Sequence, residues 1–137
     1  MSLLLEIITP EKIVYKDEVD EVIIPTVNGE IAVLPHHVNL LSQIIPGELI
    51  IKKGEKTESI AITGGFLDVN KNGVSILADY AIKAGEIEVA KAKEAQERAE
   101  RLMREKSTEK DFRIAEAELR KAILELRVAT KHKRRLV

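Results

Sequence analysis

The chain has 137 residues, of which 45% are hydrophobic and 3% aromatic, with a formal net charge of −1 and no cysteine. That length allows one domain or a small domain with an appendage, whose core must consist of Ile, Leu, Val and Ala. The lack of cysteine excludes disulfides, thiolate nucleophiles and zinc sites that need a Cys ligand. No run approaches the roughly 20 apolar residues of a membrane span, and the N-terminus lacks the basic stretch of a signal peptide. We therefore expect a soluble cytosolic protein that reaches a membrane only through partners.

Charge is unevenly distributed along the chain. Residues 1–85 carry 7 Lys/Arg against 12 Asp/Glu, a net of −5, whereas residues 86–137 carry 15 against 11, a net of +4. An acidic body with a basic arm predicts that the arm meets an acidic surface.

Residues 1 to about 84 have the pattern of short strands separated by turns. Asn28-Gly29 is a strong tight-turn signal, residues 71–73 form another turn, and residues 35–41 are expected to be a loop. Eight to ten strands at this spacing, without βαβ alternation, predict an antiparallel β-sandwich or flattened barrel. The expected strands are 3–8, 12–16, 18–25, 30–34, 48–52, 58–63, 66–70 and 74–78, with a short edge strand at 80–83.

Gly85 marks the expected boundary between two domains, because the composition changes there from β-branched residues to Ala, Glu, Lys and Arg. We expect a first helix over 87–106, a turn at 107–110, and a second helix that runs to residue 132. Ser107 or Thr108 can cap the second helix, whose acidic start and basic end suit the helix dipole. The last third of the chain is therefore predicted to be an antiparallel helical hairpin.

The two helices offer matching apolar seams, at the alternating spacing of three and four residues that is typical of packed helices. Alanine favours helix but buries little apolar area, and a buried CH₂ contributes only about 0.8 kcal/mol. We hypothesise that this thinly packed hairpin can leave its resting place and pack elsewhere. The seam is Phe112, Ala115, Leu119, Ala122, Leu126 and Ala129 in the second helix and Ala92, Ala95, Ala99 and Leu102 in the first.

Three local patterns suggest sites but are explained better by structure. His36-His37 has no third ligand at a useful spacing, which favours a loop histidine bonded to backbone over a metal site. Gly64-Gly65 is followed by neither Lys-Ser/Thr nor a helix, which favours a bulge or a close strand approach over a phosphate loop. The basic tail has no interleaved aromatic residue for stacking on bases, and no Ser, His and Asp pattern supports catalysis. We therefore expect no metal, no catalytic residue and no nucleic-acid partner.

Three parts of the sequence resemble a known family, the epsilon subunit of bacterial F-type ATP synthases, over essentially the whole chain. The resemblance implies an α+β fold, with an N-terminal antiparallel β-sandwich of ten strands at 1–84 and a C-terminal two-helix antiparallel hairpin at 85–137. The parts that carry it are Asn28-Gly29-Glu30 with 34–41 and 45–47, the signature at 64–69 with 74–79, and the Ala/Glu/Arg-rich hairpin with Leu126-Arg127-Val128 near its end.

The resemblance implies a subunit that performs no catalysis and requires no cofactor. It would belong to the rotor in the central stalk of a proton-translocating ATP synthase, peripheral to the cytoplasmic face of the cell membrane and without insertion. Its partners would be the gamma subunit, the c-ring, and the alpha and beta subunits of the catalytic head. The matching positions imply that Glu30 and His37 lie near the c-ring and gamma. The other interpretation is structural: Glu30 would belong to a tight turn, and His37 would be an ordinary polar residue of a loop.

In this family the hairpin is expected in two states, folded on the sandwich or extended along gamma toward the catalytic head. The extended state inhibits ATP hydrolysis, and its basic face meets acidic loops of the catalytic subunits, which agrees with the basic arm. A difference of a few kcal/mol in binding free energy between two docking sites is enough to move such an arm from one site to the other. The implied contacts are Arg113, Arg120, Lys121 and Arg127, together with the tail Lys131 to Arg135.

Some members bind ATP on the folded hairpin through a motif of Ile or Leu, Asp, two residues, Arg and Ala. Lysine in place of arginine cannot make the planar bidentate contact to phosphate, so any binding of ATP is expected to be weak. ATP, with or without Mg²⁺, is thus the candidate regulatory ligand, and ordinary first-turn charges are the other interpretation. The matching residues here are Ile87, Glu88, Lys91 and Ala92, with Arg98 retained and Lys121 in place of a further arginine.

Two functions of different classes are compatible with the sequence. The favoured one is a rotary stalk subunit with a mobile regulatory hairpin, which requires a stable complex with a gamma-like coiled coil. The alternative is a free-standing nucleotide-sensing module with the sandwich as scaffold, which would bind ATP without a larger complex. An enzyme is disfavoured because no constellation of catalytic side chains is recognisable.

Overall fold

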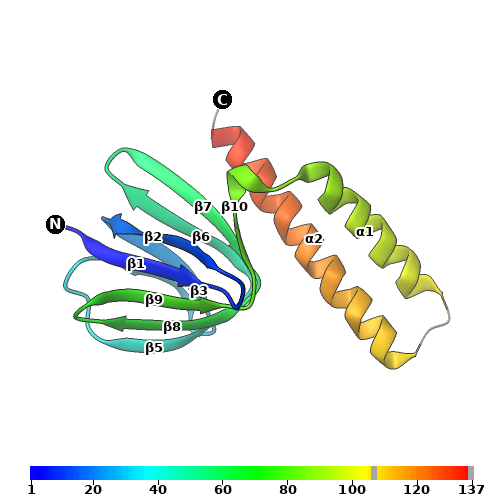
Figure 1. Cartoon of the computed structure of the whole chain (residues 1–137), viewed down its shortest axis with the longest axis horizontal. Coiled ribbons are helices and arrows are strands. Elements are labelled where there is room, and N and C mark those ends of the chain that lie inside the picture. Colours follow the sequence, from blue (N-terminus) through cyan, green and yellow to red (C-terminus); the bar gives the residue numbers. More distant parts are fainter. Residues whose placement is uncertain (106–107, 136–137) are drawn as a thin grey trace. The chain divides into compact units, whose positions relative to one another are not determined.

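The computed structural model describes residues 1–105 and 108–135. The chain divides into two compact units, Met1–Lys83 and Ala84–Val137, and the strands belong to the first (Figure 1). In chain order the strands are β1 (Leu3–Ile8), β2 (Ile13–Val19), β3 (Glu21–Thr26), β4 (Gly29–Val33), β5 (Leu40–Ile44), β6 (Gly47–Lys53), β7 (Lys56–Ile62), β8 (Gly65–Asn70), β9 (Gly73–Ala78) and β10 (Ala81–Lys83).

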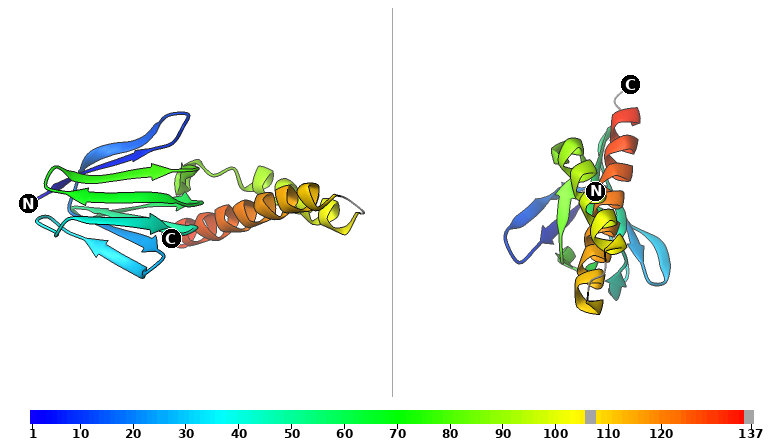
Figure 2. Two further views of the ribbon diagram at one scale, coloured as in Figure 1. Left: turned by 90° about the horizontal axis from the view of Figure 1, so that it is seen from below. Right: turned by 90° about the vertical axis from the view of Figure 1, so that its right-hand side faces the viewer.

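The strands form one ten-stranded sheet that folds over into two layers (Figures 1 and 2). Its order is β10-β7-β6-β3-β5-β8-β9-β1-β2, with β4 paired to β3 outside this path. β3 joins the two layers, because Glu21–Ile23 pairs with β6 whereas Thr26 pairs with β5. The described pairs are antiparallel except β1 with β9, which is parallel. The predicted β-sandwich is thus confirmed, with this one parallel pair as an exception.

The core of the sandwich follows from the alternation of side chains along each strand. In β1 Leu5 and Ile7 are fully buried, and in β8 Leu67 is buried whereas Phe66 faces outward. Tyr15 is the single aromatic member of the described core, and the rest are aliphatic. The composition therefore predicted the core correctly, because a chain with so few aromatic residues can fill its interior only with Ile, Leu, Val and Ala.

Residues 40–44 differ from the prediction. The sequence pattern indicates a loop through Leu40-Leu41, whereas the structure has β5 there, paired along its length with β8. Leu41 faces outward and is 78% exposed, so the strand lacks a clean alternation of apolar and polar residues. Its conformation is set by the non-local pairing with β8, which single-sequence periodicity does not reveal.

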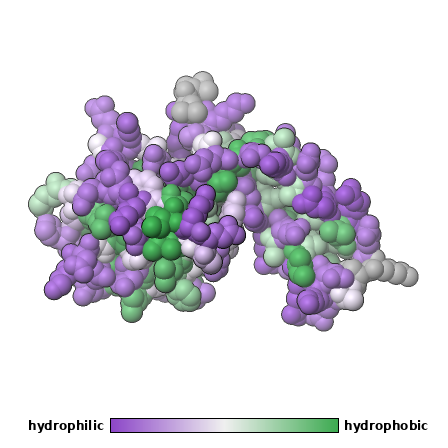
Figure 3. Space-filling model, viewed as in Figure 1, coloured by the Kyte–Doolittle hydropathy of each residue, from purple (hydrophilic) through white to green (hydrophobic). Residues whose placement is uncertain are grey.

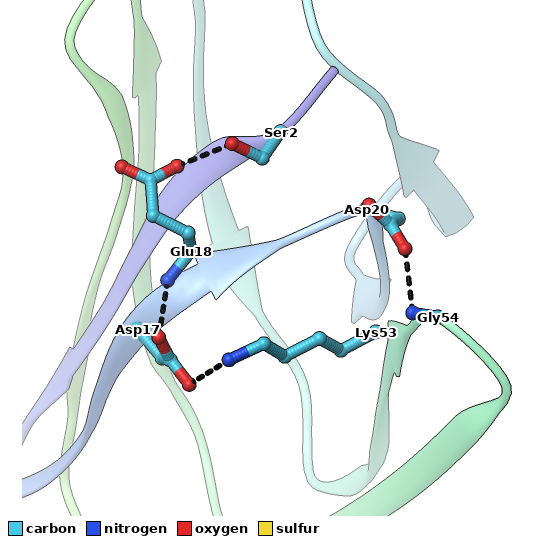
Figure 4. Close-up of polar contacts among 6 residues, drawn as sticks. All are labelled: Ser2, Asp17, Glu18, Asp20, Lys53 and Gly54. Atoms are coloured by element: carbon cyan, nitrogen blue, oxygen red, sulfur yellow. Dashed lines mark hydrogen bonds and ion pairs between the residues drawn. The ribbon is translucent and has the colours of Figure 1, made fainter.

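Polar contacts connect the two layers at one edge, where the C-terminal end of β2 and the residue after it meet the end of β6 and its turn to β7 (Figure 4). The Lys53 ammonium donates to Asp17 at 2.5 Å, and the Gly54 amide donates to Asp20 at 2.6 Å. Farther along β2, the Lys83 ammonium lies 5.9 Å from the centre of the Tyr15 ring. Among the described strands β2 pairs with β1 alone, and a cleft of about 1010 Å³ remains beside its free edge.

The second unit begins with the short 3₁₀ helix η1 (Ala84–Glu86), followed by α1 (Val89–Arg104) and α2 (Glu109–Arg135). Thr108 caps α2, because its hydroxyl oxygen accepts from the Asp111 amide at 3.1 Å. The capping role predicted for Thr108 is confirmed, whereas Ser107 lies outside the described residues. The first helix is shorter than predicted, because α1 begins at Val89 rather than at 87 and ends at Arg104, with Glu105 already extended. α2 extends three residues beyond the predicted end at 132.

The two helices run antiparallel (Figures 1 and 2), and alanines are the commonest buried residues between them. Four of the six alanines predicted for the seam are buried, whereas Ala95 and Ala129 are half-buried. Leu102 and Phe112 differ from the prediction, because they lie near the end of the hairpin where the two helices are joined and are 41% and 39% exposed. Leu124 and Val128 are buried on another side of α2 and were not predicted. The buried alanines are Ala92 and Ala99 of α1 and Ala115 and Ala122 of α2.

Candidate functional site and docking surfaces

Glu30 lies on β4, directly after the tight turn that the sequence predicts at Asn28-Gly29. Thr26 fixes this turn, because its hydroxyl donates to the Gly29 carbonyl at 2.7 Å and accepts from the Asn28 amide at 3.2 Å. Gly29 has a φ of +104°, in the left-handed region that glycine tolerates. Glu30 is exposed, so its carboxylate is available to a partner on the outside of the sandwich.

His37 lies in the loop that connects β4 to β5. Its amide donates to the Leu34 carbonyl at 3.2 Å, and its ring Nδ1 lies 2.8 Å from the Val38 carbonyl oxygen. The neighbouring His36 has a φ of +69°, which tightens the loop. A loop histidine bonded to backbone, the structural interpretation of this pair, therefore agrees with the geometry.

Glu30 and His37 mark two separate places on the sandwich. Glu30 is at the beginning of β4, next to the β3–β4 turn, whereas His37 follows the other end of the strand. The structure therefore does not bring these two predicted contact residues into one site. Within residues 1–105 and 108–135, no group of three or more His, Asp or Glu side chains is placed to hold a metal ion.

Gly65 occupies a close approach between β8 and β9. A Cβ atom at this position would lie 2.1 Å from the Leu77 carbonyl oxygen and 2.9 Å from the Ala78 Cα. Its φ of +149° is also one that side chains with a Cβ rarely adopt. The predicted close strand approach at Gly64-Gly65 is thus confirmed, and the glycines serve the sheet rather than a phosphate.

Apolar side chains gather on the outer face of the layer formed by β8, β9, β1 and β2. In the sheet register Phe66 is opposite Leu77, Leu77 is opposite Ile8, and Ile8 is opposite Ile13. Phe66 is 63% exposed, Leu77 and Ile13 are each 56% exposed, and Ile8 is half-buried. Figure 3 shows hydrophobic surface over this side of the sandwich, surrounded by hydrophilic side chains. We call these four residues the apolar row.

Sequence reasoning missed the apolar row, although a signal for it exists. In β8 and β9 the pairs Phe66-Leu67 and Ile76-Leu77 place an apolar residue on each face of the strand. A strand with one solvent-facing side normally alternates with polar residues, so apolar residues on both faces indicate that the outer face is also covered. Single exposed apolar residues need no explanation, but a row across four strands marks an interaction surface.

Two of the four cations expected to contact the catalytic head form ion pairs within α2. Arg113 contacts Glu109 at 2.5 Å, and Arg120 contacts Glu116 at 3.2 Å, each pair four residues apart. Arg127 is exposed and has no carboxylate partner among the described residues. Lys121 differs from these three, because it is half-buried and has an interaction of its own.

The residues that match the ATP motif are only partly accessible. Ile87 and Ala92 are 9% and 5% exposed, so they serve packing. Glu88 and Lys91 form an exposed ion pair at 3.1 Å before and within the first turn of α1. Arg98 is exposed and follows Lys91 by seven residues, which places it on the same side of the helix. The exposed charges therefore line one side of α1.

Two side chains of β2 have perturbed acidity. A hydrogen bond from Lys53 and one from the Glu18 amide lower the pKa of Asp17 below its usual value. Burial, followed by the nearby carboxylates of Glu58 and Asp17, raises the pKa of Tyr15 to about 12. Both effects follow from the contacts that connect β2 to the opposite layer, and they indicate a structural role for this edge.

A sandwich with an exposed apolar row, followed by a charged helical hairpin, characterises a docking subunit of a larger assembly. Residues 2–84 match the family model of the ATP synthase delta/epsilon chain β-sandwich domain, and residues 86–130 match that of its long α-helix domain. The chain belongs to the ATP synthase delta/epsilon chain family.

Known relatives are similar over almost the full length of the chain. The ATP synthase epsilon chain of Syntrophobacter fumaroxidans is 46% identical over 127 residues, which cover 93% of this chain and 95% of the relative. That of Chloroflexus aggregans is 45% identical over 134 residues, which cover 97% and 96%. A chain in the Euglena gracilis mitochondrial ATP synthase structure is 25% identical with a TM-score of 0.65, over 99% of this chain and 82% of that one. A chain of the Tetrahymena thermophila central stalk and c-ring structure, 15% identical with a TM-score of 0.62 over 92% and 95%, shares the fold.

Family membership confirms the resemblance seen in the sequence and the absence of an enzymatic role. The chain is a non-catalytic subunit of an ATP synthase. A membrane-spanning helix is not found in the part of the chain that the structure describes.

Proposed function

We propose that the chain is the rotor subunit that joins a gamma subunit to the c-ring in the central stalk of a proton-translocating ATP synthase. The observation that carries this proposal is the apolar row, a ready-made docking surface on a non-catalytic subunit. Burial of one large apolar side chain contributes about 1.5–3 kcal/mol. Burial of the row against gamma would therefore stabilise the stalk substantially.

The c-ring contact is assigned to the loops of the sandwich. Glu30, exposed beside the β3–β4 turn, would meet polar loops of the ring, and His37, beyond the other end of β4, would lie at a separate contact with gamma. Contact with the ring holds the chain at the cytoplasmic face of the cell membrane without inserting it. Exposed loops positioned by a rigid sandwich are suited to such contacts.

The hairpin is proposed to restrain ATP hydrolysis by moving to the catalytic head. Its alanine seam is thin, and its exposed face is rich in arginine, among which are Arg113, Arg120 and Arg127. Docking of these cations, with Lys121, on acidic loops of the alpha and beta subunits would hold the extended state. A preference of a few kcal/mol is enough to shift the population between two docking sites.

ATP is the proposed regulatory ligand of the folded hairpin. Glu88, Lys91 and Arg98 supply exposed charges on one side of α1, with Lys121 contributed by α2 and Ile87 and Ala92 supporting the backbone. Weak binding is expected, because Lys91 is already paired with Glu88 and contacts phosphate as a point charge.

The test of the stalk function is assembly with purified gamma subunit and c-ring. Leu77→Lys places a charge in the middle of the apolar row and should weaken the gamma complex at least about tenfold, which corresponds to 1.4 kcal/mol. Thr57→Lys introduces the same side chain at an exposed position of β7 and serves as the matched control. Equal binding of both variants, or no binding of the unaltered chain at any salt concentration, would contradict the proposal.

The alternative of a free-standing nucleotide-sensing module makes a different prediction. Such a module would bind ATP in isolation and would not co-purify with gamma. Binding of ATP by a chain that also fails to assemble would favour this alternative over the stalk function.

A further inference from the structure

β2 lies at one edge of the sheet and offers backbone groups to a further strand. In the described part of the chain it pairs with β1 alone, and a cleft of about 1010 Å³ lies beside its other edge. An open strand edge is a template for pairing with another chain, and proteins usually guard it. The seven residues of β2, Ile13–Val19, therefore need either a partner or a guard.

The backbone groups that face outward from β2 belong to Lys16 and Glu18. The Glu18 amide donates to the Asp17 carboxylate at 2.8 Å. Opposite Glu18 in β1, the Leu4 carbonyl is directed at Gly73 of β9, so Leu4 and Glu18 do not exchange hydrogen bonds with each other. Outward groups recur at every second residue of an antiparallel strand, so those of Lys16 face the same way as those of Glu18.

Two carboxylates guard this edge (Figure 4). Asp17 occupies the Glu18 amide, and Lys53 at the end of β6 holds that carboxylate in place through a bond of 2.5 Å. Asp20 accepts from the Gly54 amide at 2.6 Å, which holds the β6–β7 turn beside the end of β2. The bond from Lys53 also lowers the pKa of Asp17, so the guarding carboxylate is charged at neutral pH. One of the two outward amides is thus already occupied.

The outer-face charges of β2 fit a second copy of the same strand in one register. Lys16 and Glu18 are exposed, and Lys16 pairs with Glu6 of β1 on that face at 3.6 Å. When two copies of β2 pair antiparallel about a two-fold axis centred on Asp17, each Lys16 lies opposite Glu18 of the other copy. A pairing centred on Lys16 or on Glu18 would instead place like charges opposite each other. Charge complementarity therefore favours the register centred on Asp17.

We propose that the free edge of β2 is a pairing surface for a second copy of this chain, and that Asp17 keeps this surface closed. In the register that suits Lys16 and Glu18, the two Asp17 side chains lie opposite each other on the inner face, so two like charges meet. Each Asp17 would also have to release the Glu18 amide, which the pairing needs. The guard keeps the chain single until its partners bind, and it acts whether or not those partners include gamma.

The first test removes the guard. Asp17→Thr deletes the carboxylate and introduces a residue that favours strands. Self-association of the full chain is measured by analytical ultracentrifugation, and circular dichroism checks that the fold is kept. The dissociation constant of the dimer should be at least about tenfold lower than that of the unaltered chain. Glu11→Thr is the matched control, because it removes a carboxylate from an exposed position between β1 and β2 and should not increase association.

The outer-face charges test the register. Added to Asp17→Thr, Lys16→Glu places two glutamates opposite each other and should abolish the gain in association. Further addition of Glu18→Lys restores opposite charges and should restore the gain. In the Asp17→Thr dimer, hydrogen exchange should slow at the amides of residues 16 and 18 and stay unchanged in β4, which pairs with β3 alone.

The apolar row offers a competing explanation of any self-association. Asp17→Thr combined with Leu77→Lys should associate as strongly as Asp17→Thr alone, and a loss would assign the dimer to the apolar row and overturn the proposal. Association that ignores the charge at position 16, or a folded Asp17→Thr chain that associates no more than the unaltered chain, would also overturn it.

A second variant covers the case in which Asp17→Thr does not fold. Asp17→Asn keeps the shape of the side chain and removes its charge. Its gain in association should be smaller, about twofold to fivefold, because the amide oxygen can still accept from Glu18. Absence of any gain in this variant would refute the guard.

Discussion

Glu88 and Lys91 form an ion pair at 3.1 Å where α1 begins, so the two charges of the altered ATP motif neutralise each other. A phosphate would have to draw Lys91 away from this partner. The variant Glu88→Asp with Lys91→Arg restores the shorter acid and the planar guanidinium, which donates two parallel hydrogen bonds to phosphate. We predict that ATP affinity, measured by calorimetric titration of the isolated chain, rises about fivefold.

The control for this prediction is Lys93→Arg, an equivalent exchange at an exposed position of α1 outside the motif. It should leave ATP affinity unchanged, and Lys91→Ala should abolish the heat of binding. If the restored motif and the control give the same affinity, α1 does not supply the phosphate contact.

Replacement of Gly65 should reveal how closely β8 approaches β9. In Gly65→Ala the new methyl group would lie 2.1 Å from the Leu77 carbonyl oxygen, so a strand must shift. We predict a loss of about 3 kcal/mol or more in the free energy of unfolding, measured with urea. Gly54→Ala is the control, because Gly54 also has a positive φ, +60°, but its Cβ would meet open space. Gly54→Ala should lose only about 1–2 kcal/mol in the free energy of unfolding. Equal losses in Gly65→Ala and Gly54→Ala would contradict the close approach of β8 to β9.

Tyr15 should make the chain sensitive to alkaline pH. Burial, followed by the carboxylates of Glu58 and Asp17, raises its pKa to about 12 in the folded state, against an ordinary value of 10.0. Between these two values the folded chain holds more protons than the unfolded chain, so stability falls as the pH rises through this window. Tyr15→Phe should flatten that decline in melting temperature. A decline of unchanged slope in Tyr15→Phe would show that other groups cause it.

Asp17 should contribute at the acidic end of the pH range. The bond from Lys53 lowers the pKa of its folded-state carboxyl, so the stabilisation is present above the unfolded value of 3.8 and is lost as the pH falls below it. Asp17→Asn should make the melting temperature less dependent on pH in that window. Glu11→Gln, at an exposed position of the β1–β2 turn, is the control, and an equal change in both variants would speak against the Asp17–Lys53 contact.

Local signals in the sequence predicted most elements of the fold. Tight turns such as Asn28-Gly29 and the change of composition at Gly85 indicated where strands and helices begin, and Thr108 was recognisable as a cap. β5 was missed because its conformation depends on pairing with β8, about 25 residues away, rather than on its own pattern. The parallel pairing of β1 with β9 is likewise a property of the whole sheet.

The candidate surfaces were less predictable than the fold. The sequence shows where the cations of α2 are, but it does not show which of the arginines are paired. That depends on which carboxylate each guanidinium reaches in the structure. The apolar row combines residues of β1, β2, β8 and β9, and only the register of the sheet places Phe66, Leu77 and Ile8 side by side. Leu124 and Val128 were missed because the seam was assigned to a single stripe of α2.

The alanine seam gives a direct test of how tightly the hairpin is packed. Ala99 is fully buried in α1, so Ala99→Leu forces three additional carbon atoms into the seam. Overpacking of this kind costs about 1–3 kcal/mol, which should separate α1 from α2. We predict faster hydrogen exchange of the amides in 89–104, with the strands unaffected because they belong to the other unit.

Ala90→Leu adds the same side chain at an exposed position of α1 and should leave exchange unchanged. Slower exchange in Ala99→Leu would mean that the seam has room for a larger side chain. The hairpin would then be loosely held because its seam is underpacked, and not because its contact area is small.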